Sequence, residues 1–325
     1  MDPHWSGFKE KIMNLKDKKV AFVFPGQGSQ YVGMGIDFIE SNNYFIKIFE
    51  NFKTKTGFDL LNIMKEGPEE ALKETKFTQP AILAHSIMAW KSFIKDHDIS
   101  PCFVAGHSLG EFSALVANGV LDFADAMYLV HKRGEFMIKA NDGIPFSMAA
   151  IIGIDSEEVI KICAEASKQH LVVAANFNTP NQTVISGTLA GVEHAGNLAK
   201  ERKAKRVLPL VVGGPFHSPL VKNAAIWLNE EMSKVKFSDT QIPVICNVDA
   251  RPKTKASLII KKLTDQVTSS VQCVETIKYL NTQGVEVFIE FGPKKVLSGM
   301  IAQILPDAYV LNFDKLEDIT NYEKT

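Results

Sequence analysis

Cysteine is scarce in this 325-residue chain, and the few cysteines do not cluster. None of them forms a C-x-x-C pair, so neither a redox dithiol nor a cysteine-rich zinc site is indicated. Isolated cysteines are typical of small buried side chains in a protein from a reducing compartment. The eight histidines show no H-E-x-x-H or similar ligand spacing, and we therefore predict no metal site. The four cysteines are Cys102, Cys163, Cys246 and Cys273.

Long apolar runs and an excess of one charge are absent as well. No stretch approaches the roughly 18–20 apolar residues of a bilayer-spanning helix. Residues 1–19 are polar and lysine-rich, without the apolar core of a signal peptide. The formal net charge of −1 gives no indication of a nucleic acid or an anionic membrane as partner. We expect a cytoplasmic protein that binds neither; the alternative is a plastid or mitochondrial protein whose transit peptide has been removed.

The chain is organised around a short segment that contains Ser108. Residues 106–110, Gly-His-Ser-Leu-Gly, fit the G-x-S-x-G pattern of a nucleophile elbow, a sharp strand-to-helix turn that exposes a serine. Residues 102–104 predict the strand, and residues 112–118 predict a helix whose N–H groups and positive dipole end would face an oxyanion. Glycine is required because a Cβ in such a turn would collide with the backbone. Ser108 is therefore a candidate nucleophile, although an ordinary glycine-rich loop has the same pattern.

A second glycine-rich loop, residues 25–30, follows the predicted central strand 20–24. It is no phosphate-binding P-loop, because no Gly-Lys-Ser/Thr follows. It does not fit the dinucleotide motif G-x-G-x-x-G either, because Tyr31 stands where the last glycine is required. We therefore predict no nucleotide cofactor. Open α/β sheets bind ligands at the carboxyl ends of their strands, and we expect this loop to present backbone N–H groups beside Ser108.

The order of the predicted elements indicates an α/β fold with two domains. From about residue 141 the elements follow in the order β-α-β-β-α-β, which is that of a ferredoxin-like domain. We expect an α/β-hydrolase-like domain with a parallel sheet, formed by residues 17–140 and 211–316. The ferredoxin-like domain, 141–210, is inserted into it, and residues 1–16 form an N-terminal extension of unknown role.

Local patterns predict further details of individual helices. Apolar periodicity predicts a single helix at 38–52, and another at 79–94 that carries Pro80 in its first turn. The first helix of the small domain is expected to be capped by Ser156. The polar tail, residues 317–325, is expected to fray.

Two charged or titratable residues could assist Ser108. Arg133 lies in a predicted helix at 124–137, and His217 lies in a loop before a predicted helix at 220–235. A helical arginine or a loop histidine is by itself most often solvent-exposed, so neither residue alone indicates catalysis.

Four segments in order, Pro25–Gln30, Gly106–Glu111, Arg133–Gly134 and Phe216–Ser218, resemble the malonyl-CoA:acyl-carrier-protein transacylase family. The resemblance covers about residues 20–312. It implies that Ser108 attacks the thioester, that His217 is the general base, and that Arg133 binds the malonyl carboxylate. It also implies that the backbone N–H groups of Gln27 and Leu109 form the oxyanion hole.

The same resemblance implies roles for further residues. A backbone carbonyl orients the histidine in this family, here that of Gln266, although Ser270 and Cys273 stand where the family usually has proline and tryptophan. Phe216 would narrow the acyl pocket and favour malonyl over methylmalonyl groups. The remaining expected substrate-binding residues are His107 and, in the pantetheine channel, Asn176 and Asn178 with Gln182.

The expected partners follow from this resemblance. No cofactor is permanently bound; malonyl-CoA is the substrate, and the phosphopantetheine of acyl carrier protein accepts the malonyl group. We expect a monomer that receives the acidic carrier protein on a basic surface, either Lys200–Arg206 or Lys294–Lys295. Three alternatives stay open: a trans-acting polyketide-synthase acyltransferase, a serine esterase or thioesterase, and a non-catalytic module that docks carrier protein.

Overall fold

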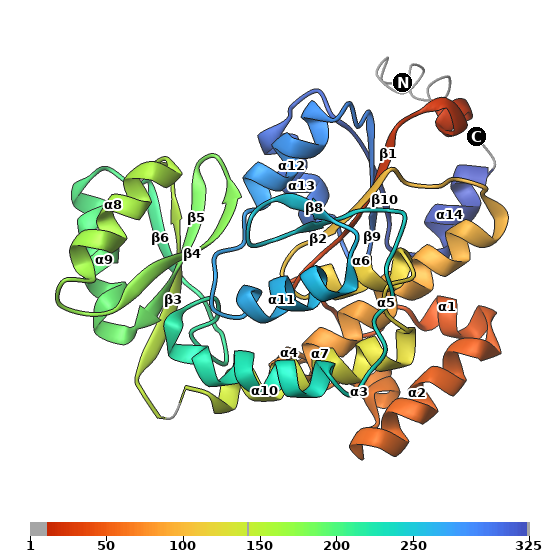
Figure 1. The fold of residues 1–325 in the computed structure, drawn as a ribbon, viewed down its shortest axis with the longest axis horizontal. Coiled ribbons are helices and arrows are strands. Elements are labelled where there is room, and N and C mark those ends of the chain that lie inside the picture. The colour runs from red at the N-terminus through yellow and green to blue at the C-terminus, as the bar shows by residue number, and fades with distance from the viewer. Residues whose placement is uncertain (1–11, 142, 324–325) are drawn as a thin grey trace.

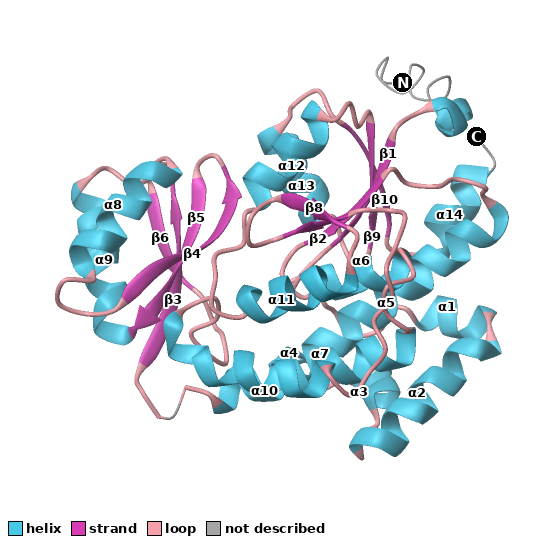
Figure 2. Ribbon diagram, viewed as in Figure 1, coloured by secondary structure: helices cyan, strands magenta, loops and turns pink. Residues whose placement is uncertain are grey.

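The computed structural model describes residues 12–141 and 143–323, which form two β-sheets with helices packed around them (Figure 1). One sheet has the strand order β10-β9-β1-β2-β7-β8, and the other has the order β4-β5-β3-β6. Figure 2 shows the four-stranded sheet at one end of the molecule. The strands are β1 (Val20–Phe24), β2 (Phe103–Gly106), β3 (Phe146–Ile152), β4 (Val172–Thr179), β5 (Gln182–Thr188), β6 (Arg206–Pro209), β7 (Val244–Cys246), β8 (Arg251–Lys253), β9 (Val287–Phe291) and β10 (Tyr309–Phe313).

The six-stranded sheet is parallel except at one edge, where β8 runs antiparallel to β7. Every residue of β1 is buried, as its apolar sequence predicts for a central strand. Phe22 and Phe24 pack into the core on one face, while Ala21 and Val23 pack into a second core on the other. Helices cover both faces, and the chain is therefore an α/β protein, as expected.

The helices on the first face include α5, α6 and α7, while α12 and α13 pack on the second. The helices before the small sheet are α1 (Ile36–Ser41), α2 (Asn43–Thr56), α3 (Leu60–Glu66), α4 (Glu69–Lys73), α5 (Thr75–Asp96), α6 (Gly110–Ala117) and α7 (Phe123–Lys139). The later ones are α8 (Ser156–Ala166), α9 (Leu189–Glu201), α10 (Lys222–Met232), α11 (Ala256–Gln266), α12 (Cys273–Thr282), α13 (Val296–Ile304) and α14 (Leu316–Glu323).

The four-stranded sheet is antiparallel throughout and belongs to a unit with the element order β3-α8-β4-β5-α9-β6. Helices α8 and α9 cover one face and share a core with Ile151 and Ile185. The other face carries Met148 and Val184, which pack with the core of the larger unit. Val271 joins the two units, because its backbone N–H and C=O pair with β4.

Helix α5 begins earlier than predicted, and Pro80 therefore lies inside it rather than in its first turn. A proline has no N–H, so the carbonyl of Lys76, four residues earlier, loses its helical donor. His131 on α7 lies 2.8 Å from this carbonyl through Nδ1 and supplies the missing hydrogen bond. The helix tolerates Pro80 because a neighbouring helix satisfies the freed carbonyl.

Three other local predictions are wrong. The cap of α8 is Asp155, whose carboxylate accepts from the backbone N–H of Glu158, and Ser156 is the first helical residue. The helix predicted at 38–52 is divided between α1 and α2, because Asn42 caps the second helix. The tail forms α14 as far as residue 323, while residues 324–325 and 1–11 lie outside the described part of the chain.

Candidate active site

Ser108 lies in the tight turn between β2 and α6, with a left-handed backbone at φ 53°. The two flanking glycines leave room for this turn. A Cβ on Gly106 would come within 2.0 Å of the Gly110 carbonyl carbon, and one on Gly110 within 2.2 Å of the Phe24 carbonyl oxygen. The glycines of the motif are therefore a steric requirement of the turn that presents Ser108.

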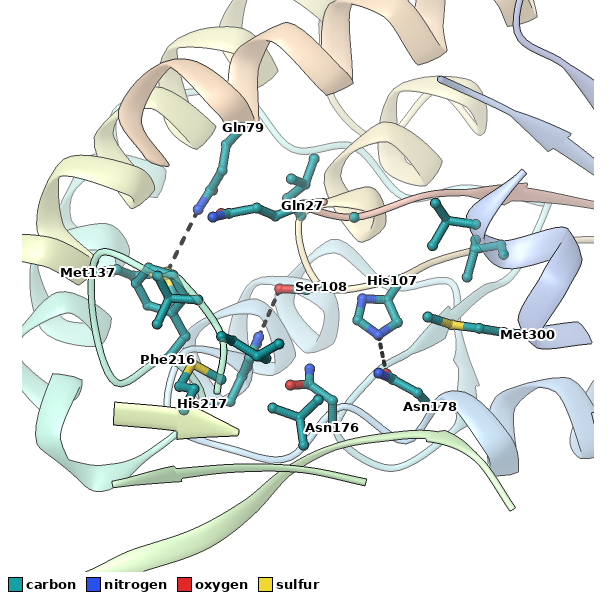
Figure 3. A pocket seen from close by; sticks show the side chains of 18 of the residues that line it. Gln27, Gln79, His107, Ser108, Met137, Asn176, Asn178, Phe216, His217 and Met300 are labelled. Carbon is teal, nitrogen blue, oxygen red and sulfur yellow. Dashed lines mark hydrogen bonds between the residues drawn. The ribbon is translucent and has the colours of Figure 1, made fainter. Parts of the chain in front are cut away.

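His217 pairs with Ser108, and together they form the centre of the site (Figure 3). The distance from Ser108 Oγ to His217 Nε2 is 2.8 Å. On its other side, His217 Nδ1 lies 2.9 Å from the carbonyl oxygen of Gln266 and 3.2 Å from that of Ser269. Carbonyl oxygens only accept, so Nδ1 carries the proton and Nε2 is free to accept one from the serine.

The imidazole of His217 is held in its neutral form. The pKa of His217 is lowered to about 3, mainly by burial and also by the positive charge of Arg133, while the hydrogen bond to Gln266 opposes this shift. Neutral backbone acceptors stabilise an imidazolium less than the carboxylate of a hydrolase triad would. His217 is therefore neutral at neutral pH, with Nε2 able to accept a proton.

Arg133 brings a buried positive charge to the serine. The side chain is 1% exposed, and its Nη2 donates to Ser108 Oγ and to Gln266 Oε1, at 3.0 Å each. Its Nη1 donates to Gln79 Oε1 at 2.8 Å. Burial lowers the pKa of Arg133 to about 10, so the guanidinium remains charged at neutral pH. Its Nε–H has no acceptor among the described residues.

Two backbone N–H groups beside Ser108 make no hydrogen bond within the described part of the chain, those of Gln27 and Leu109. The neighbouring N–H groups are taken, since Gly28 donates to Gln30 Oε1 and Gly110 to the carbonyl of His107. Both Gln27 and Leu109 line the cavity in which Ser108 lies. Within the described part of the chain, these two N–H groups at the cavity therefore remain available as hydrogen-bond donors.

The cavity of about 180 Å³ lies between the two sheets and is largely apolar on the side of Phe216 (Figure 3). Ser108, His217, Arg133, Gln27 and Leu109 line it, and Gln266 lies behind His217. The apolar lining consists of Met137, Met148, Val184, Leu210, Val212, Phe216, Val296, Leu297 and Met300.

The other predicted substrate-binding residues lie on the side formed by the small sheet. His107 Nε2 is 2.8 Å from Asn178 Oδ1, and Asn178 Nδ2 donates to Gln182 Oε1 at 3.2 Å. These contacts tie the nucleophile turn to β4 and β5, so His107 and Asn178 line the cavity while already bonded to each other. Asn176 also lines the cavity.

Sequence reasoning misses three residues that contact this machinery. Gln79 holds Arg133, Asn247 accepts from the Ser108 N–H at 2.7 Å, and Glu111 accepts from the side chain of Gln266 at 2.7 Å. Glu111 belongs to the motif that carries the resemblance, but Gln79 and Asn247 carry no sequence signal of a site. Their roles follow only from contacts between distant parts of the chain.

No group of histidine, cysteine, aspartate and glutamate side chains in the described ranges 12–141 and 143–323 could hold a metal ion. A search of the same ranges finds no helix with the length and apolar character needed to cross a bilayer.

The fold and the site define a class. The family model described as an acyl transferase domain matches residues 21–316, which include every residue of the site and, apart from Val20, both sheets. The class is therefore that of acyltransferases.

The relatives narrow this class. The malonyl CoA-acyl carrier protein transacylase of Bacillus subtilis is 46% identical over 287 residues, which cover 88% of this chain and 90% of the relative. The transacylase structure from Coxiella burnetii has a TM-score of 0.90 at 37% identity and covers 94% of this chain and 97% of its own. A malonyl-transacylase in complex with a holo type II PKS acyl-carrier protein has a TM-score of 0.89 at 37% identity, with 94% and 100% covered. This chain belongs to the malonyl CoA-acyl carrier protein transacylase family.

Proposed function

We propose that the chain transfers a malonyl group from malonyl-CoA to the phosphopantetheine thiol of acyl carrier protein, through an ester on Ser108. The observation that carries this proposal is the hydrogen bond from the buried Arg133 to the same hydroxyl that is paired with His217. A buried cation beside the nucleophile favours an acyl group that ends in a carboxylate, because an uncharged acyl group would leave the cation unpaired. The guanidinium can bind a carboxylate through two parallel hydrogen bonds, which a lysine cannot do.

In the first step, Ser108 Oγ attacks the thioester carbonyl of malonyl-CoA. His217 Nε2 takes the hydroxyl proton as the Oγ–C bond forms. The C–S bond then breaks, and His217 returns the proton to the departing thiolate. The products of this step are the malonyl ester of Ser108 and free coenzyme A.

The second step reverses the first with a new thiol. The phosphopantetheine thiol gives its proton to His217 while its sulfur attacks the ester carbonyl. Ser108 leaves with the proton that His217 returns, and the malonyl thioester of the carrier protein is released. The N–H groups of Gln27 and Leu109 stabilise the oxyanion in both steps, and the loss of one such donor typically costs roughly 10²–10³ in rate.

The lining of the cavity supports an assignment of its two sides. Phe216, Met137 and Met148 line the cavity together with Arg133, and we expect this apolar lining to disfavour the extra methyl of a methylmalonyl group by about 1–3 kcal/mol. Met300 lies on the opposite side of the cavity in Figure 3, with Asn176 between the two sides, and we place the pantetheine arm there. All these residues come from one chain, so a monomer suffices for the reaction.

The proposal includes a finer description of the fold. We assign residues 17–140 and 211–316 to an α/β-hydrolase-like catalytic domain and residues 141–210 to a ferredoxin-like domain. The mostly parallel sheet with a serine at the turn after β2, and the element order of the antiparallel unit, support these assignments.

The relatives support fatty-acid synthesis as the pathway and leave one competing function. A neighbouring structure pairs a malonyl-transacylase with a type II PKS acyl-carrier protein. That complex favours, as second candidate, a polyketide acyltransferase with the same chemistry and a different carrier.

The test is intact-protein mass spectrometry after brief mixing with malonyl-CoA, acetyl-CoA or methylmalonyl-CoA. We expect a malonyl adduct that is absent in Ser108→Ala, reduced in Arg133→Ala and discharged by holo carrier protein of fatty-acid synthesis. An adduct that only a polyketide carrier discharges would favour the second candidate. Free malonate without a lasting adduct or an acceptor thiol would mean that the chain is a hydrolase.

A further inference from the structure

Glu111 is a buried carboxylate that the steps above do not use. It lies in the first turn of α6 with no solvent exposure, and carboxylates in such places are costly unless hydrogen bonds compensate them. One oxygen, Oε2, accepts from the backbone N–H of Asn247 at 3.0 Å and from Gln266 Nε2 at 2.7 Å. The charged and titratable groups that face it are Arg133 from α7 and the Cys246 thiol from β7.

The carboxylate decides which way the Gln266 amide points. Because Oε2 of Glu111 is the acceptor, it fixes the NH₂ end of the amide toward Glu111, where this group also donates to the carbonyl of Ser108 at 3.1 Å. The carbonyl end must then face the other way, toward Arg133 Nη2 at 3.0 Å. A glutamine amide without such an anchor could turn its donor end toward the guanidinium and repel it.

The Gln266 amide also keeps Glu111 and Arg133 apart. Arg133 is held by the amide oxygens of Gln79 and Gln266 and makes no direct ion pair with a carboxylate in the described part of the chain. A direct Glu–Arg pair would satisfy the guanidinium and compete with the carboxylate of a substrate. With a neutral amide between the two groups, the negative charge of Glu111 still raises the pKa of Arg133 against the lowering by burial. The guanidinium nevertheless stays available to a ligand.

The second partner of Glu111 holds the nucleophile turn. Asn247 Oδ1 accepts from the N–H of Ser108 at 2.7 Å, and Asn247 Nδ2 donates to the carbonyl of Gly106 at 2.6 Å. These bonds hold the backbone that leads into the left-handed residue Ser108, while Gln266 holds the Ser108 carbonyl that follows it. Glu111 therefore accepts hydrogen bonds both from Asn247, which holds the Ser108 turn, and from Gln266, which holds Arg133.

We propose that Glu111 is a positioning residue that, through Gln266 and Asn247, orients Arg133 and the Ser108 turn so that the buried guanidinium stays free for an acyl carboxylate. This inference rests on the proposed malonyl transfer and deepens it. It assigns the selectivity for a charged acyl group to the Glu111–Gln266–Arg133 chain of contacts rather than to Arg133 alone.

The experiment measures single-turnover acylation of Ser108 by malonyl-CoA and by acetyl-CoA, and takes the ratio of the two rates. In Gln266→Glu a direct ion pair with Arg133 becomes possible, and we expect the ratio to fall at least tenfold, mainly through a higher KM for malonyl-CoA. In Glu111→Gln the anchor becomes an amide, and we expect a smaller fall in the same direction. Gln266→Met removes the amide but keeps the carbonyl that orients His217, and serves if Gln266→Glu does not fold.

Glu290→Gln is the matched control. Glu290 is equally buried, but it accepts from Leu297 and Ser298 at the start of α13 and contacts neither Arg133 nor Gln266. We expect this variant to lose stability, measured by urea unfolding, without a change in the ratio.

Two outcomes are decisive. Equal loss of malonyl and acetyl acylation in the Glu111 and Gln266 variants, in step with lost stability, would overturn the inference and leave Glu111 a structural residue. If the wild-type protein itself forms no malonyl ester, the proposed function fails, whatever the variants do.

Discussion

Ser108 and His217 share an unusual backbone conformation, with φ values of 53° and 57°. Left-handed backbone costs a residue with a Cβ roughly 1–2 kcal/mol, and such strain concentrates at functional sites. Among the described residues, the other non-glycine positions with positive φ are Lys203, Ala250 and Lys294. Ser108 Oγ and His217 Nε2 lie 2.8 Å apart, and both residues are therefore held in a backbone conformation that is locally unfavourable.

This strain predicts that two substitutions of Ser108 differ in their effect on the stability of the fold. Ser108→Ala keeps the Cβ and its cost, whereas Ser108→Gly removes both. We expect Ser108→Gly to be more stable than Ser108→Ala by about 1 kcal/mol, since glycine adopts positive φ without a steric penalty. Urea unfolding of both proteins measures this difference. A Gly variant that is equally stable or less stable would show that the turn is not strained.

The buried His217 predicts a pH dependence of stability. Its folded pKa of about 3 lies below the ordinary value of 6.5, so between these values the unfolded chain binds a proton that the folded chain does not. The contribution of the neutral His217 to the free energy of unfolding is fully present above pH 6.5 and is lost as the pH falls toward 3. The expected size is a few kcal/mol.

Glu111 titrates in the opposite sense, because burial raises its pKa to about 7, and the comparison must therefore be made between variants. We expect the stability of wild type relative to His217→Gln to decrease as the pH falls from 6.5 to 4, measured by urea midpoints at each pH. A difference that stays constant over this range would mean that His217 is protonated in the folded protein.

At the scale of elements, the close crossing of α5 and α7 involves Pro80 on one helix and His131 on the other. Gly134 leaves space for this contact, since a Cβ there would come within 2.7 Å of the Thr75 carbonyl oxygen. His131 then reaches the Lys76 carbonyl that Pro80 leaves without a donor. This crossing places Arg133, on the same helix as His131, at the cavity.

The pairing predicts non-additive stability effects. His131→Phe removes the donor but keeps an aromatic ring among its neighbours Phe52 and Phe58, and we expect a loss of about 1–3 kcal/mol from the orphaned carbonyl. In Pro80→Ala the Lys76 carbonyl regains a helical donor. His131→Phe should therefore cost clearly less in the Pro80→Ala background, as measured by a double-mutant cycle. Equal costs in both backgrounds would contradict this account.

Much of the fold could be predicted because local patterns determine its elements. The apolar run of β1 has the predicted bounds, and the antiparallel unit has the predicted element order. The start of α5 could not be predicted from periodicity. A helix that continues through Pro80 depends on the hydrogen bond between His131 and Lys76, which are 55 residues apart in the chain. The antiparallel strand β8 was not predicted, since its three residues include a proline and carry no alternating pattern.

Some residues of the site could likewise be predicted from the sequence, while others could not. Ser108, His217 and Arg133 lie in motifs whose residue types carry recognisable chemistry, and the structure brings them within hydrogen-bond distance. Gln79 and Asn247 could not be predicted, because neutral amides have no typical spacing and act through partners 54 and 139 residues away.

At the scale of the whole molecule, the two basic runs lie at different distances from the cavity. Lys294 and Lys295 are exposed and directly precede α13, whose first residues, Val296 and Leu297, line it. The run 200–206 lies at the other end of the small sheet, since Arg206 pairs with Ile152 while Met148 at the cavity pairs with Leu210. Arg202 is also already paired with Glu158 and Glu165.

This placement predicts that Lys294 and Lys295 receive the carrier protein, because in the proposed reaction its phosphopantetheine reaches Ser108 from a docking surface beside the cavity. We expect Lys294→Glu/Lys295→Glu to lower kcat/KM for an acidic carrier protein on the order of tenfold, and to weaken its dependence on salt. Acylation by malonyl-pantetheine, which lacks the phosphates of the nucleotide, should be nearly unchanged. The matched control is Lys200→Glu/Lys205→Glu, which makes the same change of charge on the distant run. If the control slows the transfer and the α13 variant does not, the carrier protein docks on the small sheet, and its arm must reach the cavity from that side.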